Sequence, residues 1–319
     1  MFVNRLPLRV GTRGSPLALF QANAVIAALK RLDPRLDNDS AFRVEIIRTA
    51  GDRVQDRRLA ELGGKAMFTQ EIERALTAEE IDIAVHSAKD VETDLAPGTL
   101  VAAILPREDR RDALIAPRYG SIAGLPKGGT VGTASLRRQA QLLARRPDLN
   151  VVLFRGNVET RLRKLNDGAV DATFLAAAGL KRLRREDAIT AILDPAEMLP
   201  AAGQGAILVQ GRADDADWLP LLDQISDPVS AAEVRAERAV LARLGGSCDT
   251  PVAVMAVAGP DSELSLTARL LRPDGSKEWH CSEAGSMTDA AQLGEAVGSS
   301  LRQRCDPDLL SATSGGTIG

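Results

Sequence analysis

The strongest constraint on the fold is a pattern that the chain uses twice. Residues 8–16 and 129–138 each read as a short apolar strand, a turn containing Gly-Thr, and the start of a helix capped by serine. Strand and helix signals alternate after each copy, to about residue 95 and about residue 183. This repetition predicts two α/β lobes of similar design, which would bind a ligand at the carboxyl ends of their strands.

A third part of the chain has a different pattern. A helix is predicted from Pro228 to Leu244, because Asp227 can cap it and apolar residues recur three or four positions apart. Three strands and a closing helix at residues 289–304 follow, whereas a strand at residues 207–210 suggests a return to the first lobe. The predicted domains are residues 1–105 with 206–222, residues 106–205, and residues 223–319.

Two segments carry no regular pattern. Residues 50–64 are polar and charged, and a stretch of this length without periodicity predicts a mobile lid. The chain after Cys305 ends in Ser-Gly-Gly-Thr-Ile-Gly, which predicts a disordered tail.

Composition narrows the possible functions. A net charge of -3 argues against a general nucleic-acid binder. No segment approaches 18 consecutive apolar residues and the first residues do not resemble an export signal, so we expect no membrane span and a cytoplasmic location. Three cysteines without CxxC spacing and two histidines predict neither a disulfide framework nor a metal centre.

Arginine dominates the basic residues, since the 40 lysines and arginines include only seven lysines. Codon bias alone can produce this excess. However, Arg13, Arg137, Arg138 and Arg155 all lie where predicted helices begin, and the positive end of a helix dipole disfavours cations. We therefore expect an anion at these positions, and carboxylates fit as well as phosphates because the chain has no Walker A or GxGxxG motif.

Two other residues could carry chemistry. Asp90 follows the strand predicted at residues 81–86, where open α/β sheets often place catalytic groups, but an ion pair with Lys89 explains it equally well. Cys248 lies in a Gly-Gly-Ser segment after the Pro228–Leu244 helix. It is either an attached or reacting thiol or a small apolar residue without a function.

Several motifs together resemble the porphobilinogen deaminase family, also called hydroxymethylbilane synthases. They lie at residues 11–19 (GTRGSPLAL), 86–91 (HSAKDV), 107–113 (REDRRDA), 131–138 (VGTASLRR), 155–157 (RGN) and 199–206 (LPAAGQGA). Gly-Ser-Cys-x-x-Pro at residues 246–251 resembles the family's cofactor-attachment loop. The match runs from about residue 8 to residue 305, with the motifs in the family's order.

The resemblance implies a transferase of porphyrin and heme biosynthesis. Enzymes of this family join four porphobilinogen molecules into a linear tetrapyrrole, on a dipyrromethane cofactor held as a thioether by a cysteine that corresponds to Cys248. The implied fold is α/β, with two lobes like those of periplasmic binding proteins and a smaller α+β domain with a three-stranded sheet. We expect a monomer that binds porphobilinogen, without nucleic acid, membrane or metal.

The resemblance also assigns the candidate site residues. Asp90 is the predicted catalytic residue, because a carboxylate about 3 Å from a pyrrole nitrogen would stabilise positive charge there and move protons. The predicted cofactor-binding residues, besides Cys248, are Lys89, Thr133, Ser135, Arg137 and Arg138. The predicted substrate-binding residues are Arg13, Ser15, Arg155, Arg161 and Arg182.

Three residues depart from the family pattern. Asp249 places a carboxylate beside the predicted attachment thiol, which would disfavour the thiolate unless arginines offset it. Glu61 and Glu92 stand where relatives often have lysine and proline.

Two other functions remain compatible with parts of the chain. A two-lobed protein that binds a di- or tricarboxylate without chemistry would explain the lobes and arginines, but it leaves Cys248 and the third part unused. A cysteine hydrolase would need His86 or His280 as partner of the thiol, and no signature of that class supports either residue.

Overall fold

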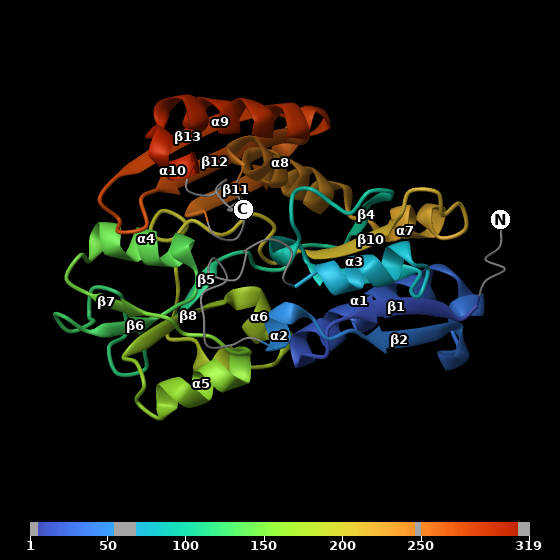
Figure 1. Cartoon of the computed structure of the whole chain (residues 1–319), viewed down its shortest axis with the longest axis horizontal. Coiled ribbons are helices and arrows are strands. Elements are labelled where there is room, and N and C mark those ends of the chain that lie inside the picture. The colour runs from blue at the N-terminus through green and yellow to red at the C-terminus, as the bar shows by residue number, and fades with distance from the viewer. Residues whose placement is uncertain (1–5, 54–67, 246–249, 312–319) are drawn as a thin grey trace, which may run out of the picture. The chain divides into compact units, whose positions relative to one another are not determined.

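The computed structural model describes residues 6–53, 68–245 and 250–311 (Figure 1). These residues form two compact units. The first contains residues up to 53, 68–108 and 206–231, and the second contains residues 109–205 and the described residues from 232 onward.

The first unit is built on a five-stranded mixed sheet of order β2-β1-β3-β10-β4. Its strands are β1 (Leu8–Thr12), β2 (Phe42–Ile46), β3 (Ile83–Ser87), β4 (Thr99–Ile104) and β10 (Ile207–Arg212). Strand β1 is parallel to β2 and β3, whereas β10 is antiparallel to β3 and β4. The strand predicted at residues 207–210 is therefore present as β10, between β3 and β4 of the first sheet.

The helices of the first unit are α1 (Pro16–Leu32), α2 (Ala50–Arg53), α3 (Gln70–Thr77) and α7 (Leu219–Ile225), with 3-10 turns at Pro34–Leu36, Asp39–Ala41 and Ala88–Asp90. Helix α1 begins where the sequence predicts, because the Ser15 Oγ accepts a hydrogen bond from the Ala18 N–H and Pro16 occupies the first turn. Val25 and Leu29 of α1 are fully buried against the sheet.

The second unit contains a sheet of closely similar arrangement, with order β7-β6-β8-β5-β9. Its strands are β5 (Asp112–Ile115), β6 (Thr130–Gly132), β7 (Asn150–Val152), β8 (Ala172–Ala176) and β9 (Ala191–Ile192). Again three parallel strands are followed by one antiparallel strand, here β5, and then an edge strand. The antiparallel strand of each lobe comes directly after the chain crosses from the other lobe.

This lobe carries α4 (Leu136–Arg145), α5 (Val158–Asn166), α6 (Ala177–Arg182) and a 3-10 turn at Glu186–Ala188. Local caps define where its helices start. The Ser135 Oγ accepts from the Arg138 N–H at 3.4 Å, and the Asn157 Oδ1 accepts from the Thr160 N–H at 2.9 Å. The predicted serine cap and Asn157 therefore both act as caps.

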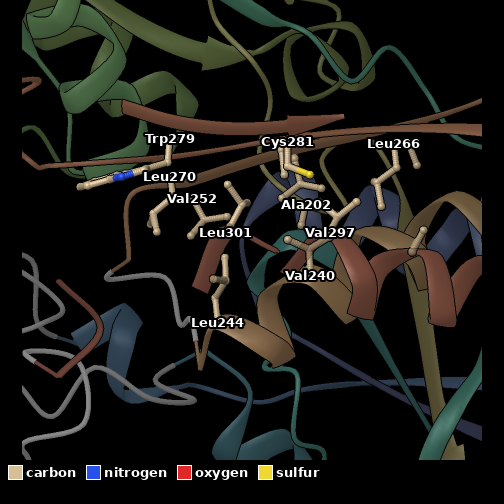
Figure 2. Close-up of a cluster of buried hydrophobic side chains, with 14 of the residues drawn as sticks. Ala202, Val240, Leu244, Val252, Leu266, Leu270, Trp279, Cys281, Val297 and Leu301 are labelled. Carbon is tan, nitrogen blue, oxygen red and sulfur yellow. The ribbon is translucent and has the colours of Figure 1, made fainter. Parts of the chain in front are cut away.

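The second unit also contains an antiparallel sheet of β11 (Val252–Ala258), β12 (Glu263–Leu271) and β13 (Glu278–Ser286). With it are α8 (Pro228–Leu244), whose first residues belong to the first unit, α9 (Ala290–Arg304), α10 (Pro307–Ser311) and 3-10 turns at Pro260–Ser262 and Met287–Asp289. Figure 2 shows Val240 of α8 and Val297 and Leu301 of α9 packed below Leu270 and Cys281 of the sheet. Gly245 ends α8 with a positive φ of 65°.

The fold class is the predicted one: two α/β lobes and a smaller α+β part with a three-stranded sheet. The predicted domain boundaries are not tested by this division into units and stay a prediction. No helix among the described residues is both long and apolar enough to span a membrane.

The lid predicted at residues 50–64 stays a prediction, because residues 50–53 form helix α2 and residues 54–64 lie outside those described. A prediction for the end of the chain was wrong. Residues 307–311, predicted to be disordered, form α10, because Leu309 is buried in the core and Arg272 pairs with Asp306 and Asp308. Helices α6 and α7 and strand β9 were not predicted from the sequence.

Candidate active site

The first unit contains a pocket at the carboxyl ends of the parallel strands β1 and β3. Its volume is about 60 Å³, and its polar lining residues are Arg13, Ser15, Gln21, Thr69, His86, Ser87 and Asp90. Arg13 and Ser15 follow β1 directly, and His86, Ser87 and Asp90 come from the end of β3 and the turn after it. Three of the predicted site residues, Arg13, Ser15 and Asp90, are therefore brought together by the pairing of two strands.

Asp90 is held on a short, well-anchored turn. The turn Ala88–Asp90 continues directly from β3, and the Ala88 N–H donates to the Ala206 carbonyl at 3.1 Å. Asp90 is half-buried in the pocket wall. A carboxylate in this position can accept hydrogen bonds from a ligand while staying in contact with water.

Arg13 supplies the cationic side of the pocket. Its guanidinium carbon lies 4.3 Å from the centroid of the Phe68 ring, a cation–π contact that orients the side chain. The Ser15 hydroxyl accepts from the Ala18 N–H at 3.2 Å as the α1 cap, and its own hydrogen can be donated to a ligand. Cationic, donor and carboxylate groups thus line one small hollow.

Two lining residues supply buried polar atoms without hydrogen-bond partners among the described residues. They are His86 Nε2 and Thr69 Oγ1, on side chains that are 5% and 1% exposed. Such atoms are unfavourable unless water or a ligand completes their bonding. Of the two, the Thr69 hydroxyl can complete its bonding with a polar group bound in the pocket.

His86 is neutral at physiological pH. Burial lowers the pKa of its imidazole to about 4, and the charge of Arg13 acts in the same direction, whereas the nearby Gln210 side chain opposes it. From the sequence, His86 was expected only as a possible partner of a cysteine nucleophile, and Gln21 and Thr69 were not expected at the site. Gln21 could have been noticed, since it is a polar residue within the largely apolar α1.

Arg137 and Arg138 have a partner that the sequence did not reveal. Both are nearly buried and contact the fully buried Asp112: Arg137 Nη1 lies 2.7 Å from one carboxylate oxygen and Arg138 Nη2 lies 2.5 Å from the other. Burial alone would raise the pKa of Asp112, but the two guanidinium groups outweigh burial and hold it well below its usual value. The anion at this helix start is thus a residue of the chain, where we had expected a ligand.

The other candidates of the second unit lie near the starts of α4 and α5 and at the end of α6. Thr133 Oγ1 accepts from the Ser135 N–H at 3.1 Å, which orders the turn before α4. Arg161 Nε donates to the Gly156 carbonyl at 3.0 Å, and Arg182 Nη2 donates to the Gly205 carbonyl at 2.7 Å. Arg155 is partly exposed beside the Asn157 cap.

Some predicted residues are not at the pocket or are not described. Lys89 is half-buried next to Asp90 but does not line the pocket. Cys248, Asp249 and Glu61 lie outside the described residues, whereas Glu92 is partly exposed. The other two cysteines, Cys281 and Cys305, are buried in the core of the C-terminal part.

The fold and the pocket define a two-lobed α/β protein with an arginine- and carboxylate-lined site at the strand ends. Residues 8–219 match the family model "Porphobilinogen deaminase, dipyromethane cofactor binding domain", and residues 231–303 match "Porphobilinogen deaminase, C-terminal domain". The chain belongs to the porphobilinogen deaminase family.

Full-length relatives support this assignment. The chain is 51% identical over 303 residues to a porphobilinogen deaminase of Paracoccus denitrificans, covering 95% of this chain and 96% of the relative. It is 45% identical over 307 residues to a chloroplastic porphobilinogen deaminase of Oryza sativa subsp. japonica, covering 96% of this chain and 86% of the relative.

Among solved structures, the VFT2 domain of BvgS from Bordetella pertussis superposes with a TM-score of 0.42 at 17% identity, covering 68% of this chain and 84% of that one.

Proposed function

We propose that the chain deaminates four porphobilinogen molecules and joins them head to tail into hydroxymethylbilane. The observation that carries this proposal is the meeting of Asp90 with Arg13 and Ser15 in one pocket, inside the region that matches the family's cofactor-binding domain. The proposal makes the chain a transferase of tetrapyrrole biosynthesis.

The arginines are proposed to hold the carboxylates of the substrate. Each porphobilinogen carries an acetate and a propionate, and guanidinium groups bind carboxylates through two parallel hydrogen bonds. Arg13 would do so in the pocket, with Ser15 as an added donor, and Arg155, Arg161 and Arg182 would do so in the second lobe.

Asp90 is the proposed catalytic group. Loss of ammonia and formation of the new carbon–carbon bond both develop positive charge on a pyrrole nitrogen, and a nearby carboxylate stabilises that charge. The same oxygens can accept the α-proton that leaves when the pyrrole regains aromaticity. Asp90 has water access for exchanging this proton, since it is half-buried rather than enclosed.

The dipyrromethane cofactor would be held through its carboxylates by cationic and hydroxyl side chains. Of the predicted residues, Lys89, Thr133 and Ser135 are proposed to do so, whereas Arg137 and Arg138 pair with Asp112. When bound, the cofactor supplies the carbon to which the first substrate unit is joined. We propose that Cys248 holds it through a thioether, because a thiolate near guanidinium groups is a good nucleophile.

The intact mass of the purified protein tests the attachment. We expect the mass of the bare chain plus two pyrrole units, and we expect Cys248→Ala to have the bare mass and no turnover. Cys281→Ala is the matched control and should keep the added mass. Wild-type protein that converts porphobilinogen at the bare mass would contradict the proposal.

The same experiments separate this function from carboxylate binding without chemistry. A binding protein would take up porphobilinogen reversibly and release no ammonia. We further propose the three domains predicted from the sequence, a monomeric state and a cytoplasmic location. Sedimentation analysis of the purified chain tests the oligomeric state.

A further inference from the structure

His86 is a buried titratable residue to which the proposed mechanism gives no role. It lies near the end of β3, its side chain is 5% exposed, and it forms part of the pocket wall. Its Nε2 atom is buried and has no partner at hydrogen-bond geometry among the described residues. A buried nitrogen of this kind needs an explanation.

The neighbouring Gln210 also has a buried polar atom without a hydrogen-bond partner in the described part of the chain. In the antiparallel pairing of β10 with β3, Leu208 lies opposite His86 and Gln210 lies opposite Ala84. Gln210 and His86 are therefore diagonal neighbours on one face of the sheet. The Gln210 Oε1 atom is also buried without a partner.

The orientation of the Gln210 amide follows from its other contacts. Its Nε2 lies 2.9 Å from Glu73 Oε1 and 2.8 Å from Thr99 Oγ1. The Thr99 hydroxyl already donates its hydrogen to the Ala96 carbonyl at 2.7 Å, so toward Gln210 it acts as an acceptor. Both amide hydrogens are thereby used, and Gln210 can offer His86 only its carbonyl oxygen.

An acceptor facing His86 Nε2 requires a hydrogen on that nitrogen. The imidazole is neutral, since burial lowers its pKa to about 4 and Arg13 opposes a second positive charge. A neutral imidazole with hydrogen on Nε2 has a lone pair on Nδ1. His86 lines the pocket that also contains Asp90 and Arg13.

We propose that His86 is a second hydrogen-bond acceptor of the substrate pocket: Gln210 holds it in the Nε2–H tautomer, and its Nδ1 accepts from an N–H group of the bound pyrrole substrate. A neutral acceptor complements the Asp90 carboxylate, because it selects an N–H donor without adding charge beside Arg13. The identity of the ligand in this inference rests on the proposed function. The tautomer of His86 does not depend on that function.

Nuclear magnetic resonance of the free protein tests the tautomer. The chain has only two histidines, so a long-range ¹H–¹⁵N imidazole spectrum contains two ring systems, and His280→Gln identifies that of His86. We expect a pyrrole-type Nε2, a pyridine-type Nδ1, and no titration of His86 between pH 5 and 8. The opposite tautomer, or titration near pH 6.5, would overturn the proposal.

Two variants of His86 test the contact with substrate. Asparagine places an acceptor near the position of Nδ1. Phenylalanine keeps an aromatic ring but has no acceptor. In protein shown by mass to carry the cofactor, we expect kcat/KM of His86→Asn within about threefold of wild type and of His86→Phe about tenfold lower, the effect of one hydrogen bond.

The outcomes are distinguishable. His86→Phe with kcat/KM within about twofold of wild type would refute the role of Nδ1 while leaving the deaminase function intact. Wild-type protein without turnover of porphobilinogen would instead refute the proposed function, and the imidazole spectrum would still decide the tautomer. Thermal unfolding of each variant separates loss of contact from loss of folded protein.

Discussion

Replacing Arg137 by leucine is expected to destabilise the second unit, and not only to weaken ligand binding. Asp112 is fully buried and receives hydrogen bonds from Arg137 at 2.7 and 3.2 Å, besides those from Arg138 and Gln204. Arg137 also donates to the buried Leu199 carbonyl at 2.7 Å. Leucine removes the Arg137 donors from Asp112 and from the Leu199 carbonyl, two groups that water cannot reach.

The magnitude follows from the burial. Removing one partner of a buried ion pair destabilises a protein by about 3–5 kcal/mol. Because Arg138 still neutralises Asp112, the lower end of that range, about 3 kcal/mol, applies here. For a unit of this size, each kcal/mol lowers the melting temperature by about 2–4 °C, so the expected shift is about 6–12 °C.

Differential scanning calorimetry is the assay, with Arg145→Leu as the matched control. Arg145 lies on the same helix but is exposed and loses only one hydrogen bond, to the Ala196 carbonyl, so its replacement should cost about 1 kcal/mol or less. A melting temperature of Arg137→Leu within about 2 °C of that control would refute the reasoning. It would mean that Arg137 is free for ligands, as we first expected from the sequence.

Three further predictions concern the candidate site. Asp90→Asn should lower the single-turnover rate of cofactor-loaded protein at least 100-fold, because the amide can neither stabilise the charge nor take the proton; a rate within about threefold of wild type would assign the chemistry elsewhere. Arg155→Leu should impair cofactor loading or elongation while leaving the melting temperature nearly unchanged, since Arg155 is partly exposed; normal turnover would contradict its proposed role. His86 has a folded pKa of about 4, below its ordinary value of 6.5, so between these values only the unfolded chain binds its proton and stability should fall as the pH drops from 6.5 to 4. The free energy of unfolding should fall by about 3 kcal/mol over this range. If denaturation of His86→Gln showed the same pH dependence as wild type, this prediction would be contradicted.

Much of this protein was determined by local sequence. Helices α1 and α8 begin and end where their caps, first-turn prolines and apolar spacing predict, because these signals act within one or two turns of the chain. The repeated strand-turn-helix pattern predicted two similar lobes, and the two sheets have corresponding strand orders. The motifs were sufficient to identify the family, because each is a contiguous run of residues.

Tertiary structure decided which side chains meet. Asp112 lies 25 residues before Arg137 in the sequence, so no local pattern indicates that they pair. Gln210 lies 124 residues after His86, and only the pairing of β10 with β3 brings the two residues near each other. Likewise α10 forms where Leu309 packs into a core built from distant strands and helices. Whether an arginine at a helix start binds a ligand or a buried aspartate depends on the partner that folding places beside it, and the helix-dipole argument is the same in both cases.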